Sequence, residues 1–109
     1  MVKQGDIIKL DFNPQAGYEQ AGYRPAVVVS NDFFNYKTNL TIVCPITNTN
    51  NHFPLHIPLD NRTETTGVIL CEHIKALDLT KRNHQVIETL PVDILQKVIS
   101  VVFSEIEII

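Results

Sequence analysis

The densest group of reactive side chains in this chain lies in the polar loop of residues 19–25, directly before an apolar run at residues 26–29. Pro25 restricts Arg24 to extended backbone conformations, so the guanidinium is presented where the loop enters the sheet. Functional groups gathered in a loop on a rigid scaffold are typical of a binding or catalytic site. Arginine and tyrosine together indicate a ligand that carries phosphates and bases.

Arg24 is the first candidate for contact with an anionic ligand, although it also fits an ordinary surface arginine paired with Glu19. Glu19 itself is either a general base or only that ion partner. Tyr18 and Tyr23 either stack on bases or cover the edge of the sheet, and Gln20 adds an amide to the same loop. The loop therefore offers one strong cation and several groups whose roles stay open.

A second polar loop starts at Thr47 and continues through Asn48 to residue 53. Its composition favours a turn whose side chains bond to their own backbone. In the alternative reading the two loops face each other across neighbouring strands, and Thr47 donates a hydrogen bond to the oxyanion that Arg24 contacts. Lys75 either contacts phosphate or lies on a solvated face.

The sequence gives little support for a metal site, a reactive cysteine or another nucleophilic side chain. Cys44 and Cys71 lie in apolar, β-branched surroundings and are predicted to be buried reduced thiols. The four histidines show no recognised ligand spacing, and we predict neither a metal site nor a cofactor. They are His52, His56, His73 and His84, each read as structural or surface, with His56 on the solvent side of a strand.

The composition indicates one domain over residues 1–109, with a formal net charge of −3 and 44% hydrophobic residues. Because the acidic excess lies in the C-terminal part, nucleic-acid binding would have to be local. No apolar run approaches a membrane span of about 20 residues. The N-terminus lacks the apolar region of a signal peptide, so we expect a cytoplasmic protein without membrane contact.

Alternating and β-branched runs predict strands at residues 7–12, 25–29, 40–46, 55–59, 67–71, 73–77 and 85–90. The first of these reads as half-buried, and Pro45 indicates an irregularity or an edge. Residues 30–32 offer a helix cap for a short turn through Tyr36. Apolar spacing after Pro91 predicts one amphipathic C-terminal helix. A small, strongly bent sheet or barrel with a helix packed on it follows from this order.

The combination Glu-Gln-X-Gly-X-Arg-Pro with a strand that ends in Pro-X-Thr resembles the MazF/PemK family. These toxins are ribosome-independent mRNA endoribonucleases of type II toxin–antitoxin modules. The resemblance covers essentially the whole chain. It rests on residues 5–7, 11–14, 17–25, 43–47 and 66–68.

This resemblance implies a mainly β, SH3-like barrel of the CcdB/PemK type with a C-terminal helix, working as a homodimer. It also implies metal-independent cleavage of single-stranded RNA at short motifs, and a cognate antitoxin that lays a flexible segment across the RNA groove. The family's arginine and threonine match Arg24 and Thr47, and its loop glutamate matches Glu19. We assign RNA contacts to Tyr18, Gln20, Tyr23, Asn48 and Lys75.

The expected chemistry is attack of the ribose 2′-hydroxyl on the adjacent phosphate, with Arg24 and Thr47 at the developing charge and Glu19 as base. The proton donor stays unassigned. Some PemK-like members carry a histidine where this chain has Tyr18, and an arginine and an aspartate where it has Leu70 and Glu72, so their acid/base set does not carry over. The alternatives are a non-catalytic toxin of the same fold that inhibits DNA gyrase, and a plain RNA-binding barrel.

Overall fold

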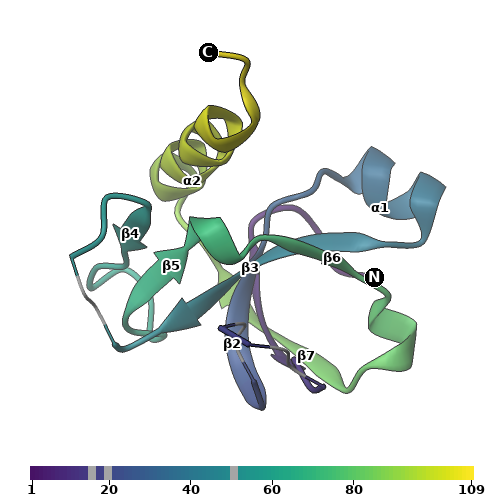
Figure 1. Ribbon diagram of the computed structural model, residues 1–109. Coiled ribbons are helices and arrows are strands. Elements are labelled where there is room, and N and C mark those ends of the chain that lie inside the picture. Colours follow the sequence, from purple (N-terminus) through teal and green to yellow (C-terminus); the bar gives the residue numbers. More distant parts are fainter. Residues whose placement is uncertain (15–16, 19–20, 50–51) are drawn as a thin grey trace.

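A bent antiparallel sheet forms the body of the chain (Figure 1). The computed structural model describes residues 1–14, 17–18, 21–49 and 52–109. The strands in these residues are β1 (Asp6–Asp11), β2 (Tyr23–Val28), β3 (Thr41–Thr47), β4 (His56–Pro58), β5 (Val68–Leu70), β6 (Lys75–Leu77) and β7 (His84–Thr89). The α-helices are α1 (Asp32–Thr38) and α2 (Val92–Ile106), and short 3₁₀ turns cover Cys71–His73 and Leu79–Lys81.

Strand β3 is the organising element of the sheet, whose order is β4-β5-β3-β2-β1-β7 with β6 also paired to β3. One side of β3 pairs with β2, while the other side pairs first with β6 and then with β5. Pro45 lies at the change from β6 to β5, where its missing N–H removes no ladder bond to either strand. Of the two alternatives predicted for Pro45, the edge was wrong, because the residue is in an interior strand, and the irregularity is the change of partner strand at this point.

The sheet buries apolar side chains on both of its faces. Ile7, Val27 and Cys44 belong to a core beneath α2, together with Ile94 and Val98 of that helix. Their alternate neighbours form the second core on the opposite face, a set that includes Ile8, Leu10, Ala26, Val28 and Val43. Strand β1 was predicted to be half-buried, but Ile7 and Ile8 are both fully buried because α2 covers the second face.

The predicted antiparallel fold with a C-terminal helix is confirmed, and α2 starts one residue after Pro91. The turn predicted after residue 32 is instead a full helix, α1. The Asn31 carboxamide oxygen accepts from the backbone N–H of Phe34 at 2.8 Å, which satisfies one of the donors left open at a helix start. Helix α1 ends at Thr38, because the next residue, Asn39, has a φ of 59° that breaks the helical path.

Two differences from the predicted elements bear on the site. Tyr23 and Arg24 were placed in a loop, yet they are the first residues of β2, paired with Asp11 and Leu10. The strand predicted at residues 73–77 begins only at Lys75, because the chain turns at Cys71–His73. That turn sets Glu72 and His73 beside the ends of β3 and β4.

The two cysteines are free, buried thiols, as predicted. A hydrogen bond to Cys71 and burial both raise the pKa of the Cys44 thiol. In the described part of the chain, no helix combines the length and the apolar character that crossing a bilayer would need.

Candidate active site

The register between β2 and β3 brings together the two residues that carried the sequence-based hypothesis. Ala26 pairs with Pro45, and extending that antiparallel register by two residues sets Arg24 opposite Thr47. Side chains opposite each other on neighbouring strands point to the same face of a sheet. Arg24 and Thr47 both line one pocket of about 360 Å³.

The Arg24 guanidinium is oriented by the loop that precedes β2. Its Nε donates to the carbonyl oxygen of Ala21 at 2.7 Å. One N–H of the guanidinium is used in this way, so the two terminal nitrogens still carry donors for a ligand. Arg24 is exposed at the pocket rim. Glu19, considered above as its ion partner, lies outside the described residues, as does Gln20.

Thr47 forms the local turn that its composition favoured, and it also lines the pocket. Its Oγ1 accepts from the backbone N–H of Thr49 at 3.2 Å. A hydroxyl that accepts still has its own proton to donate, so the turn and the ligand contact are compatible. Asn48 ties the same turn to the segment before β5, since its Oδ1 accepts a hydrogen bond from Thr66 Oγ1 at 2.9 Å.

Five further residues that sequence reasoning did not assign to the site line the pocket of Arg24 and Thr47, and three of them, His56, Glu72 and His73, carry titratable side chains. His56 Nε2 lies 2.8 Å from Glu72 Oε2, and His73 Nε2 lies 3.9 Å from the same oxygen. The His56 side chain is only 7% exposed, so its placement on the solvent side was wrong. His56 is covered by residues from other parts of the chain. The turn at Cys71–His73 brings Glu72 over His56, and the Phe53 ring packs edge-on against the His56 ring, with the two ring centroids 5.5 Å apart.

Local sequence gives little signal for this cluster. His56 and Glu72 are separated by 16 positions and meet through the pairing of β4 with β5, two strands of three residues each. The one cue was that Glu72 occupies a position where some relatives carry an aspartate. Nothing in the spacing of His56 or His73 identifies either residue as part of a site.

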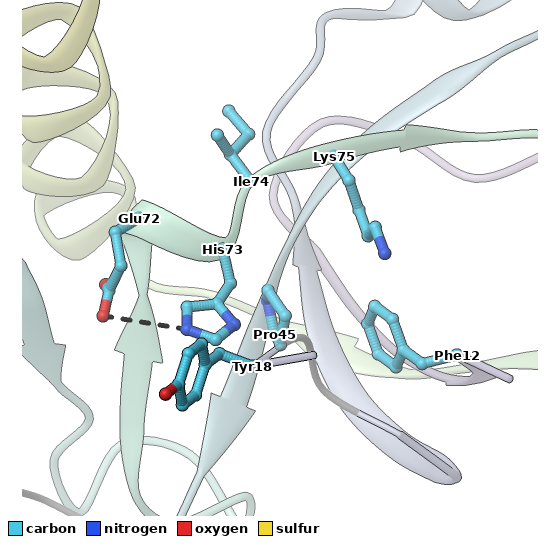
Figure 2. A pocket seen from close by; sticks show the side chains of 7 residues that line it. All are labelled: Phe12, Tyr18, Pro45, Glu72, His73, Ile74 and Lys75. Atoms are coloured by element: carbon cyan, nitrogen blue, oxygen red, sulfur yellow. Dashed lines mark ion pairs between the residues drawn. The ribbon is translucent and has the colours of Figure 1, made fainter. Parts of the chain in front are cut away.

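A second pocket of about 300 Å³ adjoins the first and shares Glu72 and His73 with it (Figure 2). We call the two pockets together the groove. The second pocket is lined by Phe12, Tyr18, Pro45, Glu72, His73, Ile74 and Lys75. It therefore combines aromatic rings with a cation, which suits bases and phosphates. The Tyr18 side chain is 99% exposed and accessible to a ligand.

The remaining predicted contact residues are less central. Tyr23 is half-exposed at the start of β2, and neither Tyr23 nor Asn48 lines the described walls of the groove. Lys75 and Tyr18 do line it, as noted above. The structure thus gathers Arg24 and Thr47 in one pocket and Tyr18 and Lys75 in the next.

Behind the groove, helix α2 contributes a second carboxylate. Burial, and then the charge of Glu72, raise the pKa of Glu105. Within the described residues, Glu105 Oε2 and His56 Nδ1 are buried without a hydrogen-bond partner. In that same part of the chain, no group of three or more histidine, cysteine, aspartate or glutamate side chains is arranged to hold a metal ion.

Comparison with known proteins gives one consistent result. Residues 3–103 match the family model described as PemK-like, MazF-like toxin of type II toxin-antitoxin system. The chain is 40% identical over 73 residues to the endoribonuclease toxin MazF of Escherichia coli, a match that covers 67% of this chain and 65% of that protein's length. It is 31% identical over 102 residues to the endoribonuclease PemK of Escherichia coli, covering 90% of this chain and 77% of PemK.

The fold is also found among solved structures. The crystal structure of MazF from Deinococcus radiodurans superposes with a TM-score of 0.89 at 34% identity, covering 95% of this chain and 94% of that one. The same protein in a MazE–MazF crystal structure gives a TM-score of 0.83, with the same identity and coverage.

Proposed function

We propose that this chain, which belongs to the family of PemK-like and MazF-like toxins of type II toxin-antitoxin systems, is an endoribonuclease that cuts single-stranded mRNA at short sequence motifs. The names of the E. coli relatives, endoribonuclease MazF and endoribonuclease PemK, support the reaction class. The observation that carries the proposal is the pocket that Arg24 and Thr47 line together. A guanidinium and a hydroxyl that line one pocket can both donate hydrogen bonds to a phosphodiester. Such donors stabilise the additional negative charge that its oxygens carry in the transition state.

The reaction begins with the RNA's own nucleophile. The ribose 2′-oxygen attacks the adjacent phosphorus, the bond from phosphorus to the 5′-oxygen breaks, and the products are a 2′,3′-cyclic phosphate and a 5′-hydroxyl. A 3′-phosphate forms if the cyclic product is then hydrolysed. The protein needs to supply proton transfer and charge stabilisation, and the scheme requires no metal-bound or serine-derived nucleophile.

Arg24 and Thr47 stabilise the phosphorane that forms during attack. The terminal guanidinium nitrogens of Arg24 donate to the nonbridging oxygens, where negative charge accumulates. The Thr47 hydroxyl donates to one of the same oxygens. Because Ala21 holds the Arg24 side chain before RNA binds, little reorganisation is needed as the charge develops.

Glu19 accepts the proton of the 2′-hydroxyl. A carboxylate is a feasible base at neutral pH, whereas a guanidinium is protonated at all ordinary pH values. Base and phosphate contacts along the strand come from Tyr18, Gln20, Tyr23, Asn48 and Lys75. Tyr18 and Lys75 line the pocket next to that of Arg24, which supports their part in this set.

The regulation follows that of toxin–antitoxin pairs. The crystal structure of MazE with MazF from Deinococcus radiodurans supports a cognate antitoxin for this chain as well. We expect the antitoxin to lay a flexible segment across the groove, so that its proteolysis would release activity. The active form is a homodimer that works in the cytoplasm, where mRNA is available.

Incubation of the purified protein with a long transcript of mixed sequence, in buffer containing EDTA, tests the activity directly. Cuts at a recurring short motif, mapped from new 5′-hydroxyl ends, are the expected outcome. Replacing the ribose at a mapped site with deoxyribose should abolish that cut, because the nucleophile is then missing. Intact RNA together with inhibition of DNA gyrase would instead identify the non-catalytic toxin.

A further inference from the structure

We propose that His73 is a catalytic residue of this chain, the donor of the proton that the 5′-oxygen takes up as it leaves phosphorus. The inference rests on the proposed endoribonuclease activity and supplies the proton donor that the mechanism above lacks. It is carried by the position of His73 between the two pockets and by the Glu72 carboxylate beside it.

His73 is located where an RNA strand in the groove would have to pass. Its side chain lines the pocket of Arg24 and Thr47 and also the pocket of Tyr18 and Lys75, of which Figure 2 shows the second. A strand that occupies both pockets therefore crosses His73. The His73 side chain is 24% exposed, which leaves its ring accessible from the groove.

Glu72 gives the protonated ring of His73 an ion-pair partner. Its Oε2 lies 3.9 Å from His73 Nε2 and is held from the other side by His56 Nε2 at 2.8 Å. The Glu72 carboxylate therefore lies within ion-pair distance of the His73 ring, although too far for a direct hydrogen bond, and its own position is fixed by His56. His56 is then a positioning residue. His56 also lines the pocket of Arg24 and Thr47, but its side chain is only 7% exposed, against 24% for His73, and its Nδ1 is buried without a partner in the described part of the chain. The His73 ring is therefore the more accessible of the two to RNA.

The other polar groups of the groove are weaker proton donors at neutral pH. Guanidinium groups such as that of Arg24 do not release a proton in proteins. Phenols and amines ordinarily titrate near pH 10, whereas an imidazole ordinarily titrates near pH 6.5. Catalysis by proton transfer is most efficient when the pKa of the donor lies near the working pH. By residue type, histidine is the best donor that the groove contains.

The step balances as follows. The 2′-oxygen forms a bond to phosphorus and gives its proton to the base, proposed above to be Glu19. The bond from phosphorus to the 5′-oxygen breaks, and its electron pair stays on that oxygen, which takes the proton from the His73 imidazolium. His73 leaves the step neutral and regains a proton from water, so one proton is taken up and one is released per cleavage.

A substrate with a better leaving group tests the assignment. In an RNA oligonucleotide that carries sulfur in place of the bridging 5′-oxygen at the mapped site, the leaving thiolate needs no proton donor. His73→Gln keeps a hydrogen-bonding side chain but cannot transfer the proton. We expect it to slow cleavage of ordinary RNA by about a hundredfold to ten-thousandfold and to cleave the sulfur substrate within a few-fold of the wild-type rate.

His84→Ala is the matched control, since His84 is an exposed histidine of β7 outside the groove. Equal losses of His73→Gln on both substrates, or no loss on either, would overturn the assignment while leaving the proposed activity intact. His73→Asn repeats the comparison if the glutamine variant does not fold, as judged by its circular dichroism. A wild-type protein that cuts neither substrate would overturn the proposed function itself, and this inference with it.

Discussion

Gly67 packs directly against the backbone of Thr47. A Cβ built on Gly67 would overlap the Thr47 carbonyl oxygen and would lie 2.8 Å from the carbonyl carbon and 3.1 Å from Asn48 Oδ1. The backbone φ of Gly67 is +117°, which side-chain-bearing residues rarely adopt. The close approach lets β5 pair with the end of β3, and so it sets the position of Thr47 in the groove.

Gly67→Ala should therefore lower both stability and cleavage. The change introduces backbone strain of about 1–3 kcal/mol, and the overlap with Thr47 adds a packing cost of about 1–3 kcal/mol. Gly22→Ala is the matched control, because Gly22 has a φ of +81° but nothing within 4 Å of its Cβ position. Urea denaturation of both variants measures the difference, and equal stabilities would show that the backbone of β3 moves away at no cost.

Arg24→Ala should remove cleavage without unfolding the protein. Arg24 is exposed, and among the described residues its guanidinium donates one hydrogen bond, from Nε to the Ala21 carbonyl oxygen. The loss of stability should therefore be small. Losing one preorganised donor to a transition-state oxyanion typically lowers kcat by about a hundredfold to a thousandfold. Single-turnover cleavage of a mapped oligonucleotide measures the effect.

Arg24→Lys separates geometry from charge in the same assay. Lysine keeps the positive charge but lacks the planar fork that can reach two phosphate oxygens. We expect this variant to recover only part of the lost rate. Full activity of Arg24→Ala would contradict the mechanism.

The cleavage rate should depend on the hydroxyl of Thr47 rather than on the shape of its side chain. Thr47→Val removes the donor, and a hydrogen bond to a charged group contributes about 1.5–3 kcal/mol, which corresponds to a roughly tenfold to hundredfold loss of rate. Thr47→Ser should keep most of the activity, because it retains the bond with Thr49 and the proton to donate. A valine variant as active as the serine variant would remove Thr47 from the catalytic set.

Glu105 should make the stability of the protein depend on pH in the opposite sense from an ordinary ion-paired carboxylate. Burial and the charge of Glu72 raise its pKa in the folded state above the unfolded value. Ionisation therefore opposes folding, and stability is lost as the pH rises through the folded pKa. Glu105→Gln should raise Tm relative to the wild-type protein at pH 7, and this gain should shrink towards pH 4, where the glutamate is mostly protonated in both states.

A gain in Tm of the same size at pH 4 and pH 7 would show instead that the amide simply packs better than the carboxyl group. Cleavage rates of Glu105→Gln, measured in parallel, report whether the charge behind the groove also affects Glu72. Since Glu105 lies on α2 and does not line the groove, we expect those rates to change little.

Short-range patterns in the sequence were sufficient to predict the elements and to name one pair of candidate site residues. Alternation gave the strands to within a few residues, and the spacing after Pro91 gave α2, because each pattern reflects contacts within a single element. The predictions were wrong where contacts with other elements determine the local structure. Arg24 became part of β2 because β1 pairs with it, and Pro45 is tolerated in an interior strand because β3 changes partner there.

The sequence by itself determined that Arg24 and Thr47 stand at the ends of two apolar strands, and that the family motif surrounds them. Only the tertiary structure decided that they share a pocket, because the meeting depends on the register between β2 and β3. It also decided that His56, Glu72 and His73 join them. Residues 16 positions apart meet there through a 3₁₀ turn and the pairing of two short strands, and no local periodicity encodes such a contact.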